Sequence, residues 1–238
     1  MVAASPEAVA RHPHLAAPEP DGVVRVDMHT HTMWSGDSTT TPDEFAVAVA
    51  ASGLDVVCIT DHNAIGGVTE LSDVVDARVI VGEELRTAAG EIIGLFLTER
   101  IPMGVGHVDA AKAIRDQGGV VYIPHPFDPM RRNMNEVALY ELAEADLIDA
   151  VEVLNAKTSL ASLNRRAVEF AAEFGIVGGA GSDGHVPDAL GAAYVEMADF
   201  GGPMEFLASL AAGRIVGHHW DEPRPWSPRI VPSVTREV

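Results

Sequence analysis

The chain has 238 residues, 47% of them hydrophobic and 21% charged, so it suits a folded domain with a full core rather than a disordered segment. Its single cysteine, Cys58, excludes an internal disulfide framework and a thiolate zinc cluster, and its apolar runs are too short to span a membrane. The formal net charge of −19 disfavours nucleic acids and anionic membranes as partners. Because the first residues lack the pattern of a secretory signal, we expect a cytoplasmic protein.

Three parts follow one another along the chain. Residues 1–22 are rich in Ala, Pro and Glu and predict a flexible leader, residues 23–217 predict one barrel domain, and the proline-rich residues 218–238 predict an irregular tail. Short β-branched runs in the central part are continuous rather than alternating, which is typical of parallel strands covered on both faces. The expected strands are 23–28, 54–60, 78–83, 91–97, 119–123, 148–154 and 176–181.

Helical patterns separate these strands. Thr41 followed by Glu44 predicts a capped helix start, and Gly53 predicts the end of that helix. Further helices are expected over 107–117 and over 158–174, where apolar residues form one stripe. Alternating strands and helices with short connections favour an α/β barrel or a doubly wound sheet.

Polar residues of the types that bind metal ions gather where the predicted strands end. Carboxyl ends of parallel strands share one face of a barrel, so we expect these side chains to converge although they lie far apart in the sequence. The residues concerned are His29, His31, Asp61, His62, Glu83, Glu84, His125, Glu152, Asn155, Asp183 and His185.

The first of these groups is a His-x-His pattern. On an extended segment His29 and His31 point to the same side, because side chains repeat every two residues. Two neutral imidazoles on one side can bind a single cation. The pattern alone is common and would fit two surface histidines, but the further strand ends with His, Asp or Glu favour a metal site.

Taken together, the motifs resemble those of the polymerase and histidinol phosphatase (PHP) family of metallophosphoesterases. The resemblance spans roughly residues 23–190 and rests on DMHTHT at 27–32, Ser35 and Asp37, TDHN at 60–63, GEE at 82–84, PHP at 124–126, EVLN at 152–155 and GSDGH at 181–185. It implies an α/β fold, a distorted TIM-like (β/α)7 barrel with its metal site at the C-terminal ends of the strands. It also implies two or three divalent ions (manganese, iron or zinc) and hydrolysis of phosphate esters by a metal-bridging hydroxide.

The resemblance further implies which residues hold the metal ions. The first ion would take His29, His31 and Asp183, the second Glu84 and His125, and the third Asp37, His62 and His185, with Glu84 bridging the first two. Of these ligands, Asp183, His185 and Glu84 would lie nearest the chemistry. The chain departs from trinuclear relatives at Glu91, where they have a histidine. A carboxylate there can bind the same metals and favours harder ones such as manganese, or it can serve as a surface charge or an outer acceptor.

Candidates for substrate contact are fewer. Arg131 and Arg132 follow the expected ligand His125, and they suit either a bidentate phosphate clamp or ion pairs at a helix start. Trp34 could stack on a base or sugar of the substrate, or act as a lid or packing residue. Asp27 and Asp61 are expected to orient ligand histidines.

Several residues outside these motifs receive a structural interpretation. His12 and His14 in the leader are expected to be solvated, and His218 with His219 is expected to be a surface pair without a metal. Cys58 lies inside an apolar strand and is expected in the core rather than as a nucleophile.

The sequence favours a metal-dependent phosphoesterase acting on a small phosphorylated metabolite, such as a nucleotide monophosphate or a sugar phosphate. Alternatives that stay open are a nuclease-type phosphodiesterase of the same fold, an amidohydrolase-type C–N hydrolase and a non-catalytic metal-binding barrel. The amidohydrolase alternative often uses a carboxylated lysine on a middle strand, whereas Lys112 falls in a predicted helix and Lys157 lies beyond a strand end. The sequence leaves the oligomeric state undetermined.

Overall fold

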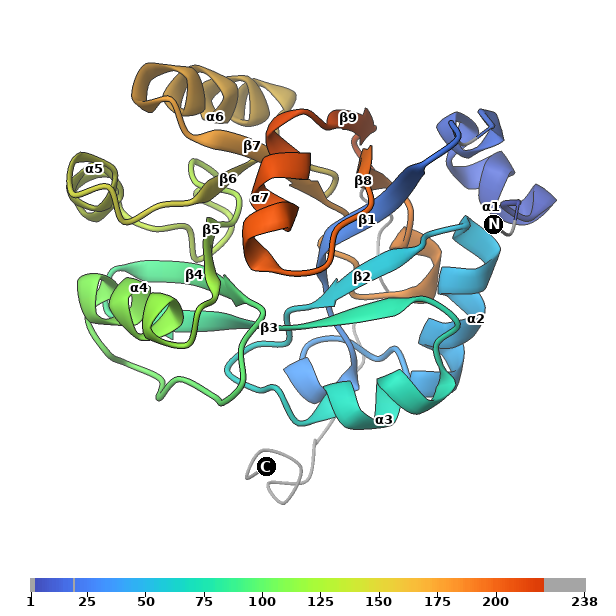
Figure 1. Ribbon diagram of the computed structural model, residues 1–238, viewed down its shortest axis with the longest axis horizontal. Coiled ribbons are helices and arrows are strands. Elements are labelled where there is room, and N and C mark those ends of the chain that lie inside the picture. The colour runs from blue at the N-terminus through green and yellow to red at the C-terminus, as the bar shows by residue number, and fades with distance from the viewer. Residues whose placement is uncertain (1–2, 19, 221–238) are drawn as a thin grey trace.

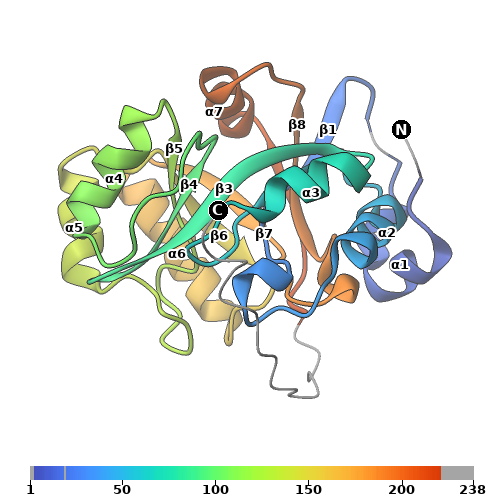
Figure 2. The ribbon, with the colours of Figure 1, turned by 90° about the horizontal axis from the view of Figure 1, so that it is seen from below.

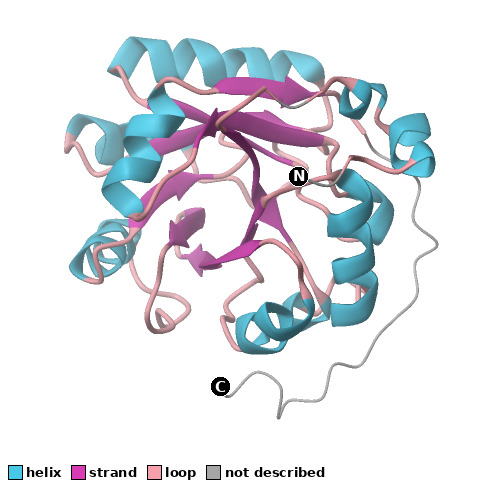
Figure 3. Cartoon of the chain, turned by 45° about the vertical axis from the view of Figure 1, so that its right-hand side comes forward, coloured by secondary structure: helices cyan, strands magenta, loops and turns pink. Residues whose placement is uncertain are grey.

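One curved sheet nearly closes into a barrel, and helices cover its outside (Figures 1 and 3). The structure is a computed structural model that describes residues 3–18 and 20–220. Over these residues the sheet has nine strands in the order β7-β6-β5-β4-β3-β2-β1-β8-β9. The strands are β1 (Val23–Thr30), β2 (Val56–Ile59), β3 (Arg78–Thr87), β4 (Gly90–Leu95), β5 (Val120–Ile123), β6 (Ala150–Asn155), β7 (Val177–Gly181), β8 (Ala193–Ala198) and β9 (Arg214–Gly217).

The helices follow the expected start and stop patterns where these were visible. Helix α2 begins with a capping box between Thr41 and Glu44 and ends at Gly53, whose φ of 67° is left-handed. The helices are α1 (Pro6–Arg11), α2 (Pro42–Ser52), α3 (Gly67–Val74), α4 (His107–Asp116), α5 (Glu136–Glu144), α6 (Ala161–Phe174) and α7 (Pro203–Ala211), with 3-10 turns η1 (Pro13–Ala16), η2 (Met33–Ser35) and η3 (Pro187–Ala189). None of the helices described here is both long and apolar enough to cross a membrane.

The sheet departs from an all-parallel barrel at β4. Strands β1, β2 and β3 run parallel, as do β5, β6 and β7, but β4 is antiparallel to both β3 and β5. Strands β3 and β4 therefore form a hairpin in which Arg86 lies opposite Glu91. As a result β3 continues past Glu84. Glu91 stands at the amino end of β4, which is the end of the barrel where the parallel strands have their carboxyl ends. The two strands that sequence reasoning missed, β8 and β9, extend the sheet beyond β1.

The barrel closes at β1, which pairs with different partners along its length. Its first half pairs antiparallel with β8, from Val23 with Ala198 to Val26 with Val195. Its last residues bond instead to the loop that follows β7, because the Asp183 N–H donates to the His29 carbonyl (2.8 Å) and the His31 N–H donates to the Gly184 carbonyl (3.0 Å). These bonds place the ends of β1 and β7 side by side.

Three apolar clusters make the core. Residues such as Ile114 and Phe170 pack α4, α5 and α6 against the outside of the sheet. Met28 and Tyr122 belong to a second cluster on the opposite face of the same strands, inside the barrel, and Phe45 belongs to a third under α2 and α3. With both faces of the strands covered, the continuous apolar runs in the sequence are explained. Cys58 is buried in the second cluster, as expected.

The segment before β1 differs from the loose leader expected over residues 1–22. Helix α1 and turn η1 pack against α2, where the Ser5 N–H donates to the Ala51 carbonyl (2.7 Å), and Leu15 is buried. Figure 2 shows α1 beside α2 at the end of the molecule away from α4 and α5. This packing is tertiary, so the local composition did not reveal it. The predicted tail beyond Trp220 lies outside the described residues.

A group of histidines that we call the flank histidine cluster, namely His12, His14 and His218, ties this segment to the rest of the chain. His12 is fully buried rather than solvated, with Nε2 donating to the Asp188 carbonyl (2.8 Å) and Nδ1 lying 2.9 Å from Nε2 of His218. His14 donates from Nε2 to the Gly191 carbonyl (2.8 Å). His218 therefore has a structural partner, and His219 is exposed.

Candidate metal centre

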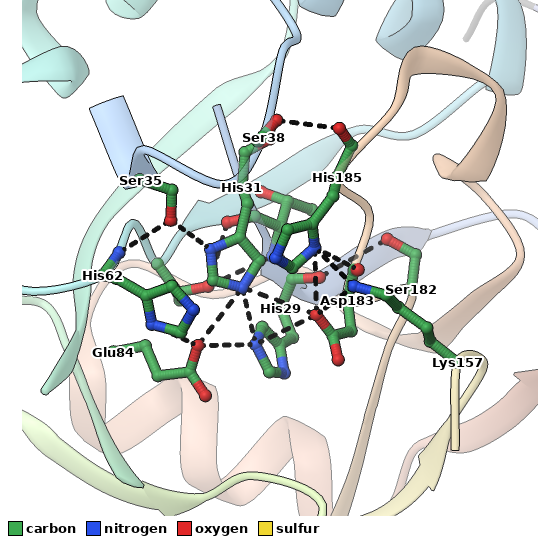
Figure 4. A network of polar contacts seen from close by, with 12 residues as sticks. His29, His31, Ser35, Ser38, His62, Glu84, Lys157, Ser182, Asp183 and His185 are labelled. Atoms are coloured by element: carbon green, nitrogen blue, oxygen red, sulfur yellow. Dashed lines mark hydrogen bonds and ion pairs between the residues drawn. The ribbon is translucent and has the colours of Figure 1, made fainter. Parts of the chain in front are cut away.

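All nine residues expected to bind metal ions come together at one end of the barrel. Figure 4 shows six of them, namely His29, His31, His62, Glu84, Asp183 and His185. Strand β1 delivers His29 and His31 on one side, with their Nε2 atoms 3.0 Å apart. The loops after β1, β2, β5 and β7 and the hairpin of β3 and β4 deliver the others. The convergence of strand ends that the sequence predicted is thus what the structure has.

The two Nε2 atoms of β1 suit a shared cation. Nδ1 of His29 donates to the carboxylate of Glu152 (3.1 Å), so Nε2 of His29 carries a lone pair. Nδ1 of His31 lies 2.8 Å from the Ser35 hydroxyl, so Nε2 of His31 can also carry a lone pair. Two lone pairs at this distance repel, whereas two imidazoles bound to one ion at about 2.0–2.1 Å bring their nitrogens about 3 Å apart. The donor set therefore fits a divalent ion.

Glu84 lies at the centre of the cluster. Its Oε2 lies 3.3 Å from Nε2 of His31, 3.4 Å from Nε2 of His29 and 3.1 Å from Nδ1 of His62. Its Oε1 lies 3.1 Å from Nε2 of His125. One carboxylate thus faces two separate groups of imidazoles, which is the arrangement that a bridging ligand needs.

The loop after β7 supplies a second carboxylate. Oδ1 of Asp183 lies 3.6 Å from Nε2 of His31 and 3.9 Å from Nε2 of His29. Oδ2 accepts a hydrogen bond from the Asn155 side chain (3.2 Å). Asp183 has a left-handed φ of 50°, a strained conformation that the bonds to β1 hold in place.

Asp37 and Glu91 complete the set from opposite sides. The carboxylate of Asp37, about half exposed, lies 3.3 Å from Nε2 of His62 and 3.5 Å from Nε2 of His185. Glu91 is buried and faces the cluster, with Oε1 3.6 Å from Nδ1 of His62 and Oε2 3.9 Å from Nε2 of His125. The structure therefore excludes the interpretation of Glu91 as a surface charge.

Three-residue sets within the cluster bring ligand atoms close enough to share an ion. These sets are His31, His62 and His185; His29, His31 and Glu84; His29, His125 and Asp183; and His62, Glu84 and Glu91. Each set mixes neutral nitrogen and anionic oxygen donors or consists of imidazoles alone, which suits divalent transition metals.

Burial and neighbouring charges set the protonation of these ligands. Burial lowers the pKa of His31 well below its usual value, and His185 beside it adds to the effect, so this imidazole is neutral. Burial alone would raise the pKa of Glu84, but His62 and His29 lower it well below the usual range, so this carboxylate is ionised. Burial opposes a charge on His29, but Glu152, Glu84 and Asp183 outweigh it and raise its pKa. The carboxylates thus favour a positive charge at this position, which is either a second proton on the ring or a cation bound to its Nε2.

A cavity of about 160 Å³ opens onto the cluster. Both arginines expected to contact substrate, Arg131 and Arg132, line it, together with Arg86 and Met130. Trp34 does not line this cavity. Its indole packs on α3 so closely that a Cβ on Gly67 would lie 2.6 Å from the ring, which supports the packing alternative for Trp34.

Two aspartates have a different role from the one expected. Oδ1 of Asp27 accepts the backbone N–H groups of His29 (3.2 Å) and Ser182 (3.0 Å), and Asp61 accepts the N–H and hydroxyl of Thr32 (both 2.6 Å). They fix the course of the loops and do not bond to imidazole rings. The residue that orients His29 is Glu152, on β6.

Sequence reasoning missed two cations near the cluster. Arg86 follows Glu84 by two residues on β3, so the two-residue period of a strand could have placed both on one face. Lys157 is buried, with Nζ 2.8 Å from Nδ1 of His185 and 3.5 Å from Oδ1 of Asp183 (Figure 4). Its position two residues after Asn155 gave no local indication of this contact.

Fold and site together define an α/β barrel that binds metal ions at the ends of its strands. A sequence model of the PHP domain matches residues 27–123, and one described as PHP-associated matches residues 161–215. An uncharacterized protein of Methanocaldococcus jannaschii is 32% identical over 195 residues, covering 77% of this chain and 78% of that protein. The chain belongs to the PHP family, as the motifs predicted.

Solved structures of low sequence identity share the fold. One is a two-domain protein from Bacteroides vulgatus that contains a predicted PHP-like metal-dependent phosphoesterase, with 18% identity and a TM-score of 0.67 over 85% of this chain and 67% of that one. Another is an amidohydrolase from Chromobacterium violaceum with bound sulfate, with 16% identity and a TM-score of 0.59 over 81% of this chain and 97% of that one. These likenesses confirm the predicted TIM-like barrel.

Proposed function

We propose that the protein is a metal-dependent hydrolase that cleaves the phosphate ester of a small metabolite, such as a nucleotide monophosphate or a sugar phosphate. The observation that carries the proposal is one cavity that is lined both by residues of the candidate metal cluster and by three arginines. A phosphate ester needs both, because its anionic charge must be balanced before a second anion can attack it. The family and the likeness to PHP-like phosphoesterases support the same reaction class.

The proposed ion-binding residues are the nine that converge. We assign His29, His31 and Asp183 to one ion, Glu84 and His125 to a second, and Asp37, His62 and His185 to a third, with Glu91 beside the second. Divalent ions such as manganese, iron or zinc supply Lewis acidity there and lower the pKa of bound water toward about 7. We propose two or three ions in this centre.

The chain's own residues hold this arrangement ready. Glu152 fixes the ring of His29 and also accepts the His125 backbone N–H (2.8 Å) and the Asn155 side chain (2.9 Å). Arg131 and Arg132 would bind phosphoryl oxygens that project into the cavity. Seven of the nine candidate ligands line the cavity, and of these we propose that Glu84, Asp183 and His185 lie nearest the reacting phosphorus.

An amidohydrolase-type C–N hydrolase is the second candidate, because the barrel is similar to that of a solved amidohydrolase and a lysine lies beside the cluster. In that class, however, a carboxylated lysine on a middle strand is often used. Here Lys157 lies beyond a strand end and contacts His185, and the carboxylate that faces two groups of imidazoles belongs to Glu84. We therefore favour the phosphoesterase. We further propose that the protein acts in the cytoplasm, without nucleic acid or membrane as a partner, which the charge of −19 supports.

The test combines metal content with turnover on one preparation. Inductively coupled plasma mass spectrometry should find about two to three manganese, iron or zinc ions per chain, and p-nitrophenyl phosphate should be hydrolysed in a chelator-sensitive manner. A panel of amides and N-acyl substrates run in parallel tests the second candidate. Less than one ion per chain, with no turnover after manganese is added, would contradict the proposal.

A further inference from the structure

A loop that lines the cavity with Met130, Arg131 and Arg132 is fixed at both of its edges. This loop, residues 126–134 between β5 and α5, we call the strap. At one edge the buried carboxylate of Asp128 accepts the N–H (2.7 Å) and the hydroxyl (2.8 Å) of Ser159, in the loop after β6, and also the Met130 N–H (3.0 Å). The strap is thereby joined to the β6 side of the site.

At its other edge the strap docks on the hairpin of β3 and β4. The Glu91 N–H donates to the Arg132 carbonyl (2.8 Å). The contact is close at Gly90, where a Cβ would lie 2.3 Å from Cα of Met134 and where φ is +133°. Only glycine suits this position, both for its conformation and for the space. The strap is therefore held by backbone contacts at this edge and by the carboxylate of Asp128 at the other.

Three arginines surround the cavity in this protein of net charge −19. Arg131 and Arg132 come from the strap, and a terminal nitrogen of Arg131 donates to the Lys157 carbonyl (3.0 Å). Arg86 comes from β3, with its Nε 3.1 Å from Glu91. The same nitrogen of Arg131 lies 3.9 Å from Oδ2 of Asp183, and Arg132 is exposed. A guanidinium has five N–H donors in a planar fork, so the contacts of Arg86 and Arg131 leave donors for a ligand.

We infer that the strap holds Arg131 and Arg132, with Arg86 opposite, as a rigid clamp for a terminal phosphoryl group, and that this clamp makes the site select phosphate monoesters over diesters. The inference rests on the proposed function and names its substrate class. A monoester carries a charge of about −1.5 to −2 near pH 7, and its three free oxygens match bidentate guanidinium donors. A diester has one negative charge and two free oxygens. Because the strap is already ordered, binding costs little conformational entropy.

The first experiment compares p-nitrophenyl phosphate with bis(p-nitrophenyl) phosphate on the manganese-loaded protein. The wild type should favour the monoester. Arg131→Met and Arg132→Met should each lower kcat/KM for the monoester about 10- to 100-fold, because each removes hydrogen bonds to a charged group, and should change the diester little. The matched control is Arg165→Met, on the exposed face of α6. An unchanged monoester-to-diester ratio in both strap variants would overturn the inference.

A second variant tests the strap rather than its side chains. Gly90→Ala should displace the strap and raise KM for the monoester more than it lowers kcat, while metal content by mass spectrometry stays at the wild-type value. Gly202→Ala is the matched control, because a Cβ at Gly202 meets nothing within 4 Å. An unchanged KM in a folded Gly90→Ala protein would contradict a role of the strap in binding.

Binding of inorganic phosphate separates this inference from the proposed function. Calorimetric titration of the manganese-loaded protein should give a phosphate dissociation constant that rises about 10-fold or more in Arg131→Met. If the wild type binds phosphate in this way but hydrolyses no ester, the clamp stands and the proposed reaction fails. If the wild type hydrolyses the diester in preference, the reaction class stands and the clamp is refuted. No phosphate binding and no turnover would overturn both.

Discussion

The protein has two histidine clusters, and they differ in what surrounds the rings. In the metal centre the imidazoles face the carboxylates of Glu84 and Asp183, and two ring nitrogens meet at 3.0 Å. In the flank histidine cluster, His12 and His14 donate to backbone carbonyls, and His12 accepts from His218. Among the described residues this second cluster has no set of ligand atoms close enough for an ion, although its ring centroids are only 5.1–6.0 Å apart.

This contrast shows that proximity of histidines does not by itself make a metal site. A ring nitrogen that donates to a carbonyl is itself closed to a cation, and a neutral carbonyl balances no positive charge. Among the described residues, no His, Asp or Glu atoms join the remaining ring nitrogens of this cluster in a set of three that could share an ion. A ring held by a carboxylate, such as His29 by Glu152, presents its other nitrogen as a ligand and shares its surroundings with negative charge. The partners of the imidazoles decide the outcome.

The largest expected difference between the clusters is in turnover. Asp183→Asn should reduce hydrolysis by more than about 100-fold, since even loss of an outer partner of a ligand costs 10- to 100-fold. His14→Asn, in the flank histidine cluster, should retain the wild-type rate and metal content. Steady-state kinetics and metal analysis of both purified variants check this. Equal losses in the two would show that folding, and not the metal centre, limits activity.

An intermediate effect is expected from the carboxylate that holds His29. Glu152→Gln weakens the acceptor for Nδ1, so manganese affinity measured by calorimetry should fall about 10- to 100-fold. Glu83→Gln is the matched control. Burial raises the pKa of Glu83 to about 7, and its Oε2 accepts the Ile101 N–H (2.9 Å), away from the cluster. Manganese affinities within twofold of each other in the two variants would refute the role given to Glu152.

A smaller effect, on stability, should come from the flank histidine cluster. Burial lowers the pKa of His12 to about 4, below the value near 6.5 of the unfolded chain. Above pH 6.5 both states are neutral there. As pH falls from 6.5 to 4, only the unfolded chain gains the proton, so stability is lost over this range. The charges and titratable groups near His12 are Arg11, His14, Asp188 and His218.

His12→Gln tests this effect, because a glutamine can donate to the Asp188 carbonyl but takes up no proton. Between pH 7 and pH 5 the melting temperature of the wild type should fall by several degrees more than that of the variant. Thermal unfolding of both proteins at several pH values makes the comparison, and the titration of the metal centre affects the two alike. Parallel curves would show that His12 contributes nothing to acid sensitivity.

Much of the fold could be predicted because its local patterns are strong. All seven expected strands form, and Thr41, Glu44 and Gly53 cap α2 as expected. The antiparallel direction of β4 could not be predicted, because a short strand buried on both faces has the same apolar run in either direction. Strand β8 depends on pairing with β1 and β9 on pairing with β8, and the order of residues 5–17 depends on contacts with α2. These are contacts between distant parts of the chain, so no local pattern predicted them.

The candidate site divides in the same way. Most of its expected ligands lie at or near strand ends. Because the carboxyl ends of the parallel strands share one end of the barrel, their convergence could be predicted although they lie far apart in the sequence. Arg86, Glu152 and Lys157 act through partners that the hairpin register and the loop contacts supply. Asp27 and Asp61 show the converse, because residues next to a ligand bond to backbone groups and not to the ring.

The two stretches matched by the family models contain eight of the nine candidate metal residues, with His125 alone outside them. Residues 124–160, between the matches, carry the strap and Lys157. Most of the candidate metal residues and the strap thus lie in different segments of one chain, although His125 directly precedes the strap and Arg86 lies within the first match. Gly90, against which the strap packs, would have to be kept. Exchanging residues 126–134 between relatives would then make a chimera with a new substrate range and the same metal chemistry.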